Sequence, residues 1–413
     1  MTPVSTGSAV LVVGSGPAGL SAALELATRQ AGLVVVVDRE ADAGGVPRHC
    51  DHTGFGLLDL HRSMTGPAYA RRLVSRALAA GVQLRLATTV ADVAPDGTVT
   101  LVGPSGITRV RPEAVLLATG ARERPRTARL VPGDRPAGVF TTGQLQQWVM
   151  SEDLAVGRRA VVVGAEHVAY SAVLTLRHAG VTTVAMVTDL PRHQTVPAFA
   201  LAARHGWRVP LRTSSRVAAL HGRGRLEGVD VEDVVTGAVD GIRADTVVFT
   251  GDWVPDHELA RRMDVALDPA TRGPRTDRWG HTSRPGVVAA GNLVHPGETA
   301  AVAALGGRDA GRRLADDLTG GERPTADGVA VVAAGALASV VPVRFDPADL
   351  PSRLVVRTAE FTGRRLVVAR QGGRELGRHR LRHSVPGRAL PVPGSVLAGA
   401  DRHDGPVELS LGP

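Results

Sequence analysis

The stretch Ala9-Val-Leu-Val-Val-Gly14-Ser-Gly16-Pro-Ala-Gly19-Leu20 decides the fold of this 413-residue chain. A short apolar run, typical of a buried parallel strand, leads directly into glycines at the first, third and sixth positions of a turn. Gly14 permits the tight turn, Gly16 lets the backbone approach a pyrophosphate, and Gly19 lets the next helix pack on the sheet. Pro17 suits the first turn of that helix, whose free N–H groups and positive dipole end then face the phosphates.

An acidic residue follows at the expected distance. The predicted helix ends near Arg29, and the next strand, 33–37, leads into Asp38, whose carboxylate can accept hydrogen bonds from both hydroxyls of a ribose. The spacing from Gly14 to Asp38 is close to that of dinucleotide-binding folds. This order and spacing of strand, glycine turn, helix, strand and acid predict that a dinucleotide binds to the first unit.

The same order of strand, glycine turn and helix returns at residues 160–179, where Gly164 follows an apolar strand. Residues 286–318 again read as a strand and a helix, which we expect to return to the first unit. We therefore predict an α/β protein with two Rossmann-like dinucleotide-binding domains, the second inserted in the first. The first domain would comprise residues 1–120 and 281–325, and the second residues 121–280.

The pattern changes after residue 340 from alternating strands and helices to short strands alone. Residues 353–357, 364–370 and 407–411 read as strands, and the pair Gly372-Gly373 as a turn. The apolar run 329–338 is interpreted as a linker that enters a strand. We predict a small C-terminal β-sandwich-like domain over residues 335–413.

Composition excludes several classes of protein. The net charge is +8, but all 48 basic residues are arginines spread along the chain, and only 3% of residues are aromatic, so nucleic acid is not an expected partner. A single cysteine, Cys50, allows neither an intrachain disulfide nor a cluster held by cysteine thiolates. No apolar run is long enough for a transmembrane segment and no signal peptide is recognisable, so we expect a cytoplasmic location.

Beyond the first unit, short motifs resemble the FAD/NAD(P)-dependent pyridine nucleotide-disulfide oxidoreductase superfamily. They are Gly44-Gly45, Ala118-Thr119-Gly120, Thr250-Gly251, Ala290-Gly291-Asn292 and Glu298-Thr299-Ala300. The resemblance implies that FAD is the dinucleotide of the first unit, with Asn292 at the usual position of an aspartate that contacts the ribityl chain. It also implies a helix whose N-terminus faces the pyrimidine edge of the flavin and stabilises negative charge there on reduction. The candidate FAD-binding residues are Gly14, Gly16, Pro17, Ala18, Gly19, Asp38, Arg39, Gly45, Arg48, Ala118, Thr119, Gly120, Gly291, Asn292, Thr299 and Ala300.

The segment after Gly45 departs from the disulfide reductases, which place a redox pair of cysteines there, so dithiol chemistry is excluded. Residues 44–50, 53–56 and 65–72 instead resemble the flavoprotein subunits of opine oxidase, hydrogen cyanide synthase, hydroxyproline or proline dehydrogenase and anaerobic glycerol-3-phosphate dehydrogenase. That resemblance implies an oxidoreductase with other subunits of a hetero-oligomeric dehydrogenase as partners and a small organic molecule as substrate.

His49, Cys50 and His52 are the candidate catalytic residues because they follow Gly45 into the expected flavin pocket. A histidine there could bind substrate or transfer a proton, Arg48 could hold an anionic substrate or the flavin edge, and the alternative is an ordinary loop. No metal site is predicted, since three ligands within four residues rarely converge on one ion.

The second glycine turn leaves NAD(P) possible but doubtful as a further cofactor. Glu166 stands where the backbone must meet a pyrophosphate, and a carboxylate there would repel the phosphates. One alternative is a stand-alone NAD(P)H-dependent FAD reductase, with Glu166 turned outward. The other is a non-enzymatic flavoprotein scaffold.

Overall fold

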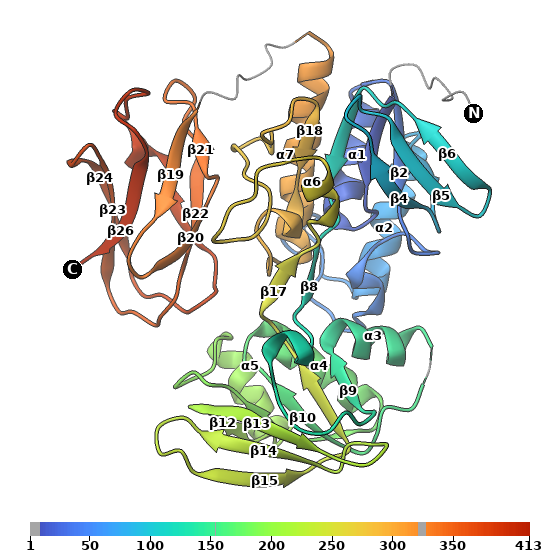
Figure 1. The fold of residues 1–413 in the computed structure, drawn as a ribbon, viewed down its shortest axis with the longest axis vertical. Helices are drawn as coiled ribbons and strands as arrows, with labels where there is room; N and C mark the ends of the chain where they lie inside the picture. Colours follow the sequence, from blue (N-terminus) through green and yellow to red (C-terminus); the bar gives the residue numbers. More distant parts are fainter. Residues whose placement is uncertain (1–8, 153, 321–327) are drawn as a thin grey trace.

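The computed structural model describes residues 9–152, 154–320 and 328–413. Figure 1 shows three bodies: an α/β domain with α1 and β2, a second α/β domain with α4 and β10, and a body of strands from β19 to β26. No helix of the described part of the chain has the length and apolarity needed to cross a membrane.

The first domain is built on a parallel sheet in the order β18-β7-β1-β2-β3. Its strands are β1 (Ala9–Val13), β2 (Leu33–Val37), β3 (Gln83–Arg85), β7 (Ala114–Leu117) and β18 (Val287–Ala289). Alternate residues of β1 enter two cores, since Val10 and Val12 pack with helices while Leu11 and Val13 pack on the opposite face. A strand that is buried on both faces needs an unbroken apolar run, which explains why β1 lacks polar residues.

Helices α1 (Pro17–Thr28), α2 (Gly66–Ala79) and α7 (Ala300–Leu318) cover one face of this sheet. Two glycines bring α7 close to α1, because a Cβ at Gly307 would lie 2.0 Å from the Ala18 oxygen and one at Gly311 would lie 2.5 Å from the Ala22 oxygen. A substitution at either glycine would therefore push the two helices apart.

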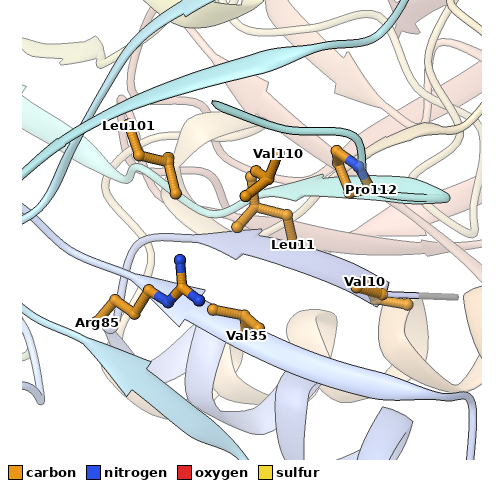
Figure 2. A pocket seen from close by; sticks show the side chains of 8 residues that line it. Val10, Leu11, Val35, Arg85, Leu101, Val110 and Pro112 are labelled. Atoms are coloured by element: carbon orange, nitrogen blue, oxygen red, sulfur yellow. The ribbon is translucent and has the colours of Figure 1, made fainter. Parts of the chain in front are cut away.

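The other face carries an antiparallel meander of β4 (Thr89–Val93), β5 (Val99–Gly103) and β6 (Gly106–Val110). A small apolar cavity of about 20 Å³ lies between the meander and the parallel sheet, with Leu11 and Val35 on one side and Leu101 and Val110 on the other (Figure 2). It has room for about one water molecule, so we regard it as a packing defect of the core and not as a ligand site.

The second domain has its own parallel sheet in the order β12-β11-β10-β16-β9. The strands are β9 (Val139–Thr141), β10 (Arg159–Val163), β11 (Thr182–Val187), β12 (Leu211–Arg212) and β16 (Thr246–Phe249). Helices α3 (Thr142–Met150), α4 (His167–His178) and α5 (Pro197–Leu201) belong to the same domain, as does a meander of β13 (Ser215–His221), β14 (Gly228–Asp233) and β15 (Val239–Arg243).

The chain enters the second domain through β8 (Ala121–Glu123) and leaves it through β17 (Trp253–Pro255), and these two strands pair in antiparallel fashion. After the short helix α6 (Glu258–Arg262), β18 pairs with β7 of the first sheet. The predicted insertion of one Rossmann-like domain in the other is confirmed, whereas the boundaries at residues 120, 280 and 325 stay predictions.

The C-terminal strands form two sheets around one apolar core, as the predicted β-sandwich requires. One sheet runs β21 (Arg344–Phe345), β19 (Val329–Ala333), β26 (Val407–Gly412), β23 (Arg365–Gln371), β24 (Arg374–Leu381). The other runs β20 (Leu337–Val341), β22 (Arg353–Thr358), β25 (Leu390–Pro393). The interpretation of residues 329–338 as a linker is wrong for its first half, because β19 pairs with β26 and buries Val329 and Val331.

Candidate cofactor site

The glycine turn between β1 and α1 has the backbone geometry that the motif predicts. Gly14 has φ +105°, and a Cβ there would lie 2.4 Å from the Ala118 oxygen at the end of β7. A Cβ at Gly19 would lie 1.9 Å from the Gly14 oxygen, so this glycine lets α1 start directly against the turn. A Cβ at Gly16, in contrast, would meet no protein atom within 4 Å. Gly16 is therefore not needed for packing within the protein.

The N-terminus of α1 is free of capping side chains. The helix starts at Pro17, its N-cap residue is Gly16, and no side chain accepts a hydrogen bond from its first turn, which also contains no acidic residue. Gly45, with φ +65°, brings a second stretch of bare backbone beside the turn, since its Cβ would lie 2.8 Å from the Gly16 Cα. The two segments form a cradle of main chain around a positive helix end, which suits an anionic group.

Asp38 lies at the carboxyl end of β2, next to the cradle. Its Oδ2 accepts hydrogen bonds from the Ser15 main-chain N–H and side-chain hydroxyl, both at 2.6 Å, and its Oδ1 accepts one from the Glu40 N–H at 2.9 Å. The carboxylate is thus held in a fixed orientation at the edge of the turn. A carboxylate oxygen accepts more than one hydrogen bond, so Asp38 can still receive a ribose hydroxyl.

Two further predicted segments reach the same edge of the sheet. Ala118-Thr119-Gly120 follows β7, where Gly120 has φ +77° and the Thr119 hydroxyl donates to the Asp256 carbonyl at 2.7 Å. Gly291, with φ +71°, follows β18, and its Cβ would lie 2.6 Å from the Cβ of Ala18. These residues surround the start of α1 because carboxyl ends of parallel strands meet at one edge.

The loop from Gly291 to α7 closes on itself through Asn292. The Asn292 side chain donates to the Glu298 carbonyl at 3.2 Å and accepts from the Glu298 N–H at 2.8 Å. The Thr299 hydroxyl then caps α7 by accepting from the Val302 N–H, and Ala300 is the first helical residue. Asn292 therefore fixes the turn before α7, and one amide hydrogen is left for a ligand.

The two predicted arginines differ in their distance from the glycine turn: Arg48 Nε donates to the Gly45 carbonyl at 3.4 Å, beside the cradle, whereas Arg39 points to other side chains. Arg39 is exposed and its guanidinium lies 3.5 Å from Asp256. The Arg48 guanidinium lies 3.4 Å from Asp42 and 3.8 Å from Glu40, so it is engaged by carboxylates of the neighbouring loop.

The three candidate catalytic residues lie in and after a single 3₁₀ turn, η1 (Val46–His49), and all contact the second domain. His49 Nδ1 is 2.8 Å from the Ser151 hydroxyl, and His52 Nε2 is 3.0 Å from the Ser171 hydroxyl. The buried Cys50 thiol donates to Gln146 Oε1 at 3.4 Å, and Gln146 Nε2 in turn donates to Ser171 at 2.9 Å. Their contact partners come from α3, its C-cap residue and α4.

Burial controls the charge of these side chains. Burial raises the pKa of the Cys50 thiol to about 12, with a further contribution from the negative charge of Glu123, so the thiol stays neutral. Burial and the neighbouring Arg48 lower the pKa of His49, which favours the neutral imidazole. The described residues contain no group of three or more His, Cys, Asp or Glu side chains that could hold a metal ion.

A side chain covers the glycine turn of the second domain, whereas the backbone at Gly16 in the first domain is bare. The Glu166 carboxyl folds back against the turn, because a Cβ at Gly164 would lie 2.6 Å from Glu166 Oε2 and one at Gly251 would lie 3.2 Å from Glu166 Oε1. Oε1 is buried and has no hydrogen-bond partner among the described residues. Burial raises the pKa of this carboxyl. The side chain thus lies where a phosphate would approach, and the idea that Glu166 turns outward has no support in this geometry.

The C-terminal domain reaches the loop before α7 through one buried ion pair. The Arg357 guanidinium of β22 contacts the Glu298 carboxylate, and both side chains are almost fully buried. His295 lies on the other side, with Nδ1 3.6 Å from Glu298. Although burial alone would raise it, the pKa of Glu298 is lowered by His295 and Arg357, so the carboxylate stays charged.

Sequence reasoning does not identify Gln146, Ser171 or Arg357. The only available signal is weak: Gln146 is a polar residue on the buried stripe of α3 that also contains Leu145 and Val149. Their roles depend on contacts between segments that are far apart in the chain.

Comparisons with known proteins agree with this geometry. The family model described as "Pyridine nucleotide-disulphide oxidoreductase" matches residues 8–307. A subunit of the opine oxidase of Rhizobium meliloti (strain 1021) is 33% identical over 156 residues, which cover 37% of this chain and 32% of the relative. The alpha subunit of the sarcosine oxidase of Corynebacterium sp. (strain P-1) is 31% identical over 268 residues, which cover 60% of this chain and 26% of that relative. The crystal structure of T. acidophilum thioredoxin reductase has the same fold, with a TM-score of 0.64 at 22% identity over 75% of this chain and 99% of that one.

Proposed function

Because the chain belongs to the pyridine nucleotide-disulphide oxidoreductase family and is an FAD-dependent oxidoreductase, we propose that it is a flavoprotein subunit of a hetero-oligomeric dehydrogenase. In this proposal the chain would hold FAD where a small organic substrate or a partner subunit can deliver a hydride or an electron pair. The chain spans about a third or less of the length of these two curated relatives, each of which is named as one subunit of an oxidase. Opine and sarcosine, in their names, are amino-acid derivatives, so we propose a substrate of that class.

The residues around the first glycine turn fit FAD. The bare cradle of Gly14, Gly16 and Gly45 and the uncapped N-terminus of α1 would hold the pyrophosphate, and Asp38 would hold the adenosine ribose. Gly120, Gly291 and Asn292 lie at the same sheet edge and would line the path of the flavin half. When bound, FAD supplies reversible two-electron chemistry, and the protein positions and tunes it.

The residues of the η1 turn would form one wall of the substrate pocket. A neutral His49 can accept a proton from a protonated amine, and the neutral Cys50 thiol adds no charge that would repel an electron-rich donor. His52, Ser171 and Gln146 hold this turn against the second domain. We propose that these residues position substrate and exclude water.

One observation carries the proposal: the second glycine turn is covered by the carboxyl of Glu166. The carboxyl occupies the space that a phosphate would enter, and it also repels a phosphate when it is ionised. NAD(P)H is therefore not the electron donor in this proposal, and electrons reach the flavin from substrate or from another protein of the complex.

Anaerobic mixing of the purified yellow protein with NADH and with NADPH tests this assignment. We expect the flavin absorbance to persist with either nucleotide. The Glu166→Gly variant serves as a matched comparison, since it removes the carboxylate, and we expect tighter nucleotide binding in that variant only. Rapid bleaching of the wild-type flavin by NADH or NADPH would contradict the proposal and support a stand-alone NAD(P)H-dependent reductase.

A second experiment separates an enzyme from a flavoprotein scaffold. Amino acids, N-alkyl amino acids and opines are added anaerobically to the protein purified with its native partners. We expect reduction of the flavin by one of these classes. A yellow complex that none of them reduces would favour the scaffold.

A further inference from the structure

A cavity of about 390 Å³ lies on the flank of the first domain, away from the glycine turn. It is open to solvent and bordered by the loop 59–64, by α2 and by α7, and four arginines line it: Arg62, Arg72, Arg76 and Arg308. Its volume is within the range of about 300–1,000 Å³ that is common for small-molecule sites. None of the residues proposed to hold FAD lines this cavity, so it is a separate site.

The four guanidinium groups come from three segments and face one space. Arg72 and Arg76 are four residues apart on α2, which places both on the same side of the helix. Within the described ranges, none of the four side chains makes a hydrogen bond or an ion pair, unlike Arg122 and Arg216, which bind carboxylates. Positive charge thus predominates around the pocket, which attracts an anion.

One carboxylate, Asp59, also lines the pocket. Asp59 Oδ2 accepts a hydrogen bond from the Tyr69 hydroxyl at 2.6 Å, and Oδ1 is buried, so no ligand in the pocket reaches it. The carboxylate offsets part of the arginine charge, but the lining keeps a net positive charge. The guanidinium donors of the lining therefore suit a multiply charged anion.

We propose that this cavity binds a small molecule that bears phosphate groups, held by the four arginines. A phosphate dianion offers several oxygens to planar guanidinium groups and neutralises more positive charge than a single carboxylate does. The site has a direct connection to the η1 turn, because Gly66 at the start of α2 donates its N–H to the Cys50 carbonyl at 3.1 Å. Ligand binding here would restrain the helix on which the candidate substrate pocket rests.

Isothermal titration of the FAD-loaded protein with inorganic pyrophosphate and with ribose 5-phosphate tests the proposal. We expect saturable binding with one site per chain. The double variant Arg72→Gln/Arg76→Gln should lose at least about tenfold in affinity, since each charge-assisted contact contributes that much or more. The matched control is Arg71→Gln, which alters an exposed arginine of the same helix that does not line the cavity and should bind as the wild type does.

The Asp59→Asn variant adds a readout for charge. It removes a negative charge from the lining and should bind pyrophosphate more tightly than the wild type does. Weaker binding of pyrophosphate by this variant would contradict an anion site. Equal binding by the wild type and the double variant, or no saturable binding at all, would overturn the proposal. Binding of an acidic peptide without binding of either phosphate would overturn it too, and would identify the cavity as a docking surface for an acidic protein.

Discussion

The substitution Gly16→Glu isolates the proposed pyrophosphate contact from the folding of the protein. A Cβ at Gly16 meets no protein atom within 4 Å, and the backbone there has φ −74°, which any residue adopts. A side chain at this position is thus accommodated by the protein itself. Only a ligand lying on the N-terminus of α1 would meet it.

The expected loss of affinity follows from charge. A glutamate carboxylate about 4 Å from the nearest phosphate charge costs about 4 kcal/mol at an effective dielectric constant near 20. Since about 1.4 kcal/mol corresponds to a factor of ten, FAD binding should weaken by roughly a thousandfold. Gly16→Ala, which adds bulk without charge, should lose less.

Flavin content after gel filtration and titration of the apoprotein with FAD measure this loss. Gly306→Glu is the matched control, because Gly306 is exposed on α7 and its Cβ would also meet nothing within 4 Å. The control should retain FAD, and thermal unfolding of the apoproteins should be alike. A Gly16→Glu protein that stays yellow with wild-type affinity would refute the placement of the pyrophosphate.

Two further substitutions and one chemical modification test other parts of the structure. Gly19→Ala forces a Cβ to within 1.9 Å of the Gly14 oxygen and should lower the free energy of unfolding by about 1–3 kcal/mol in a urea titration; no loss would contradict the tight turn. Burial opposes protonation of His281, yet hydrogen bonds to Asp277 and Asp317 raise its pKa from 6.5 to about 9. The shift contributes about 3 kcal/mol to the free energy of unfolding, complete below pH 6.5 and lost as pH rises through 9. His281→Gln should therefore reduce the dependence of the free energy of unfolding on pH between 6.5 and 9. An unchanged dependence would exclude the interaction. The raised pKa of Cys50, about 12, predicts alkylation of the folded protein by iodoacetamide roughly a thousandfold slower than after unfolding, as mass spectrometry would measure; equal rates would show an accessible thiolate.

The fold could be predicted because it depends on local patterns. The apolar run before Gly14 and its echo before Gly164 each specify a buried parallel strand followed by a glycine turn, and both form as expected. The start of the C-terminal domain was harder to place, because the residues of β19 alternate only weakly between apolar and small, and their pairing partner lies far along the chain in β26.

The candidate site was predictable only in its main-chain part. Glycines with positive φ and an acid after β2 are encoded by residue type, whereas the environment of Cys50 depends on Gln146 and Ser171 across a domain interface. Likewise, the position of Glu166 identifies a conflict with a phosphate, but the inward direction of its carboxyl follows from packing against Gly251, which a sequence pattern does not contain.

The buried pair of Glu298 and Arg357 connects the C-terminal sandwich to the start of α7 in the α/β part. A fragment that ended before β22 would leave a negative charge in a dry environment with only His295 beside it, and removing one partner of such a pair commonly costs about 3–5 kcal/mol. The start of α7 would then have to rearrange to admit water. If another protein bound the sandwich and shifted it relative to the first domain, the start of α7 would shift as well. We expect that helix end to face the pyrimidine ring of the flavin.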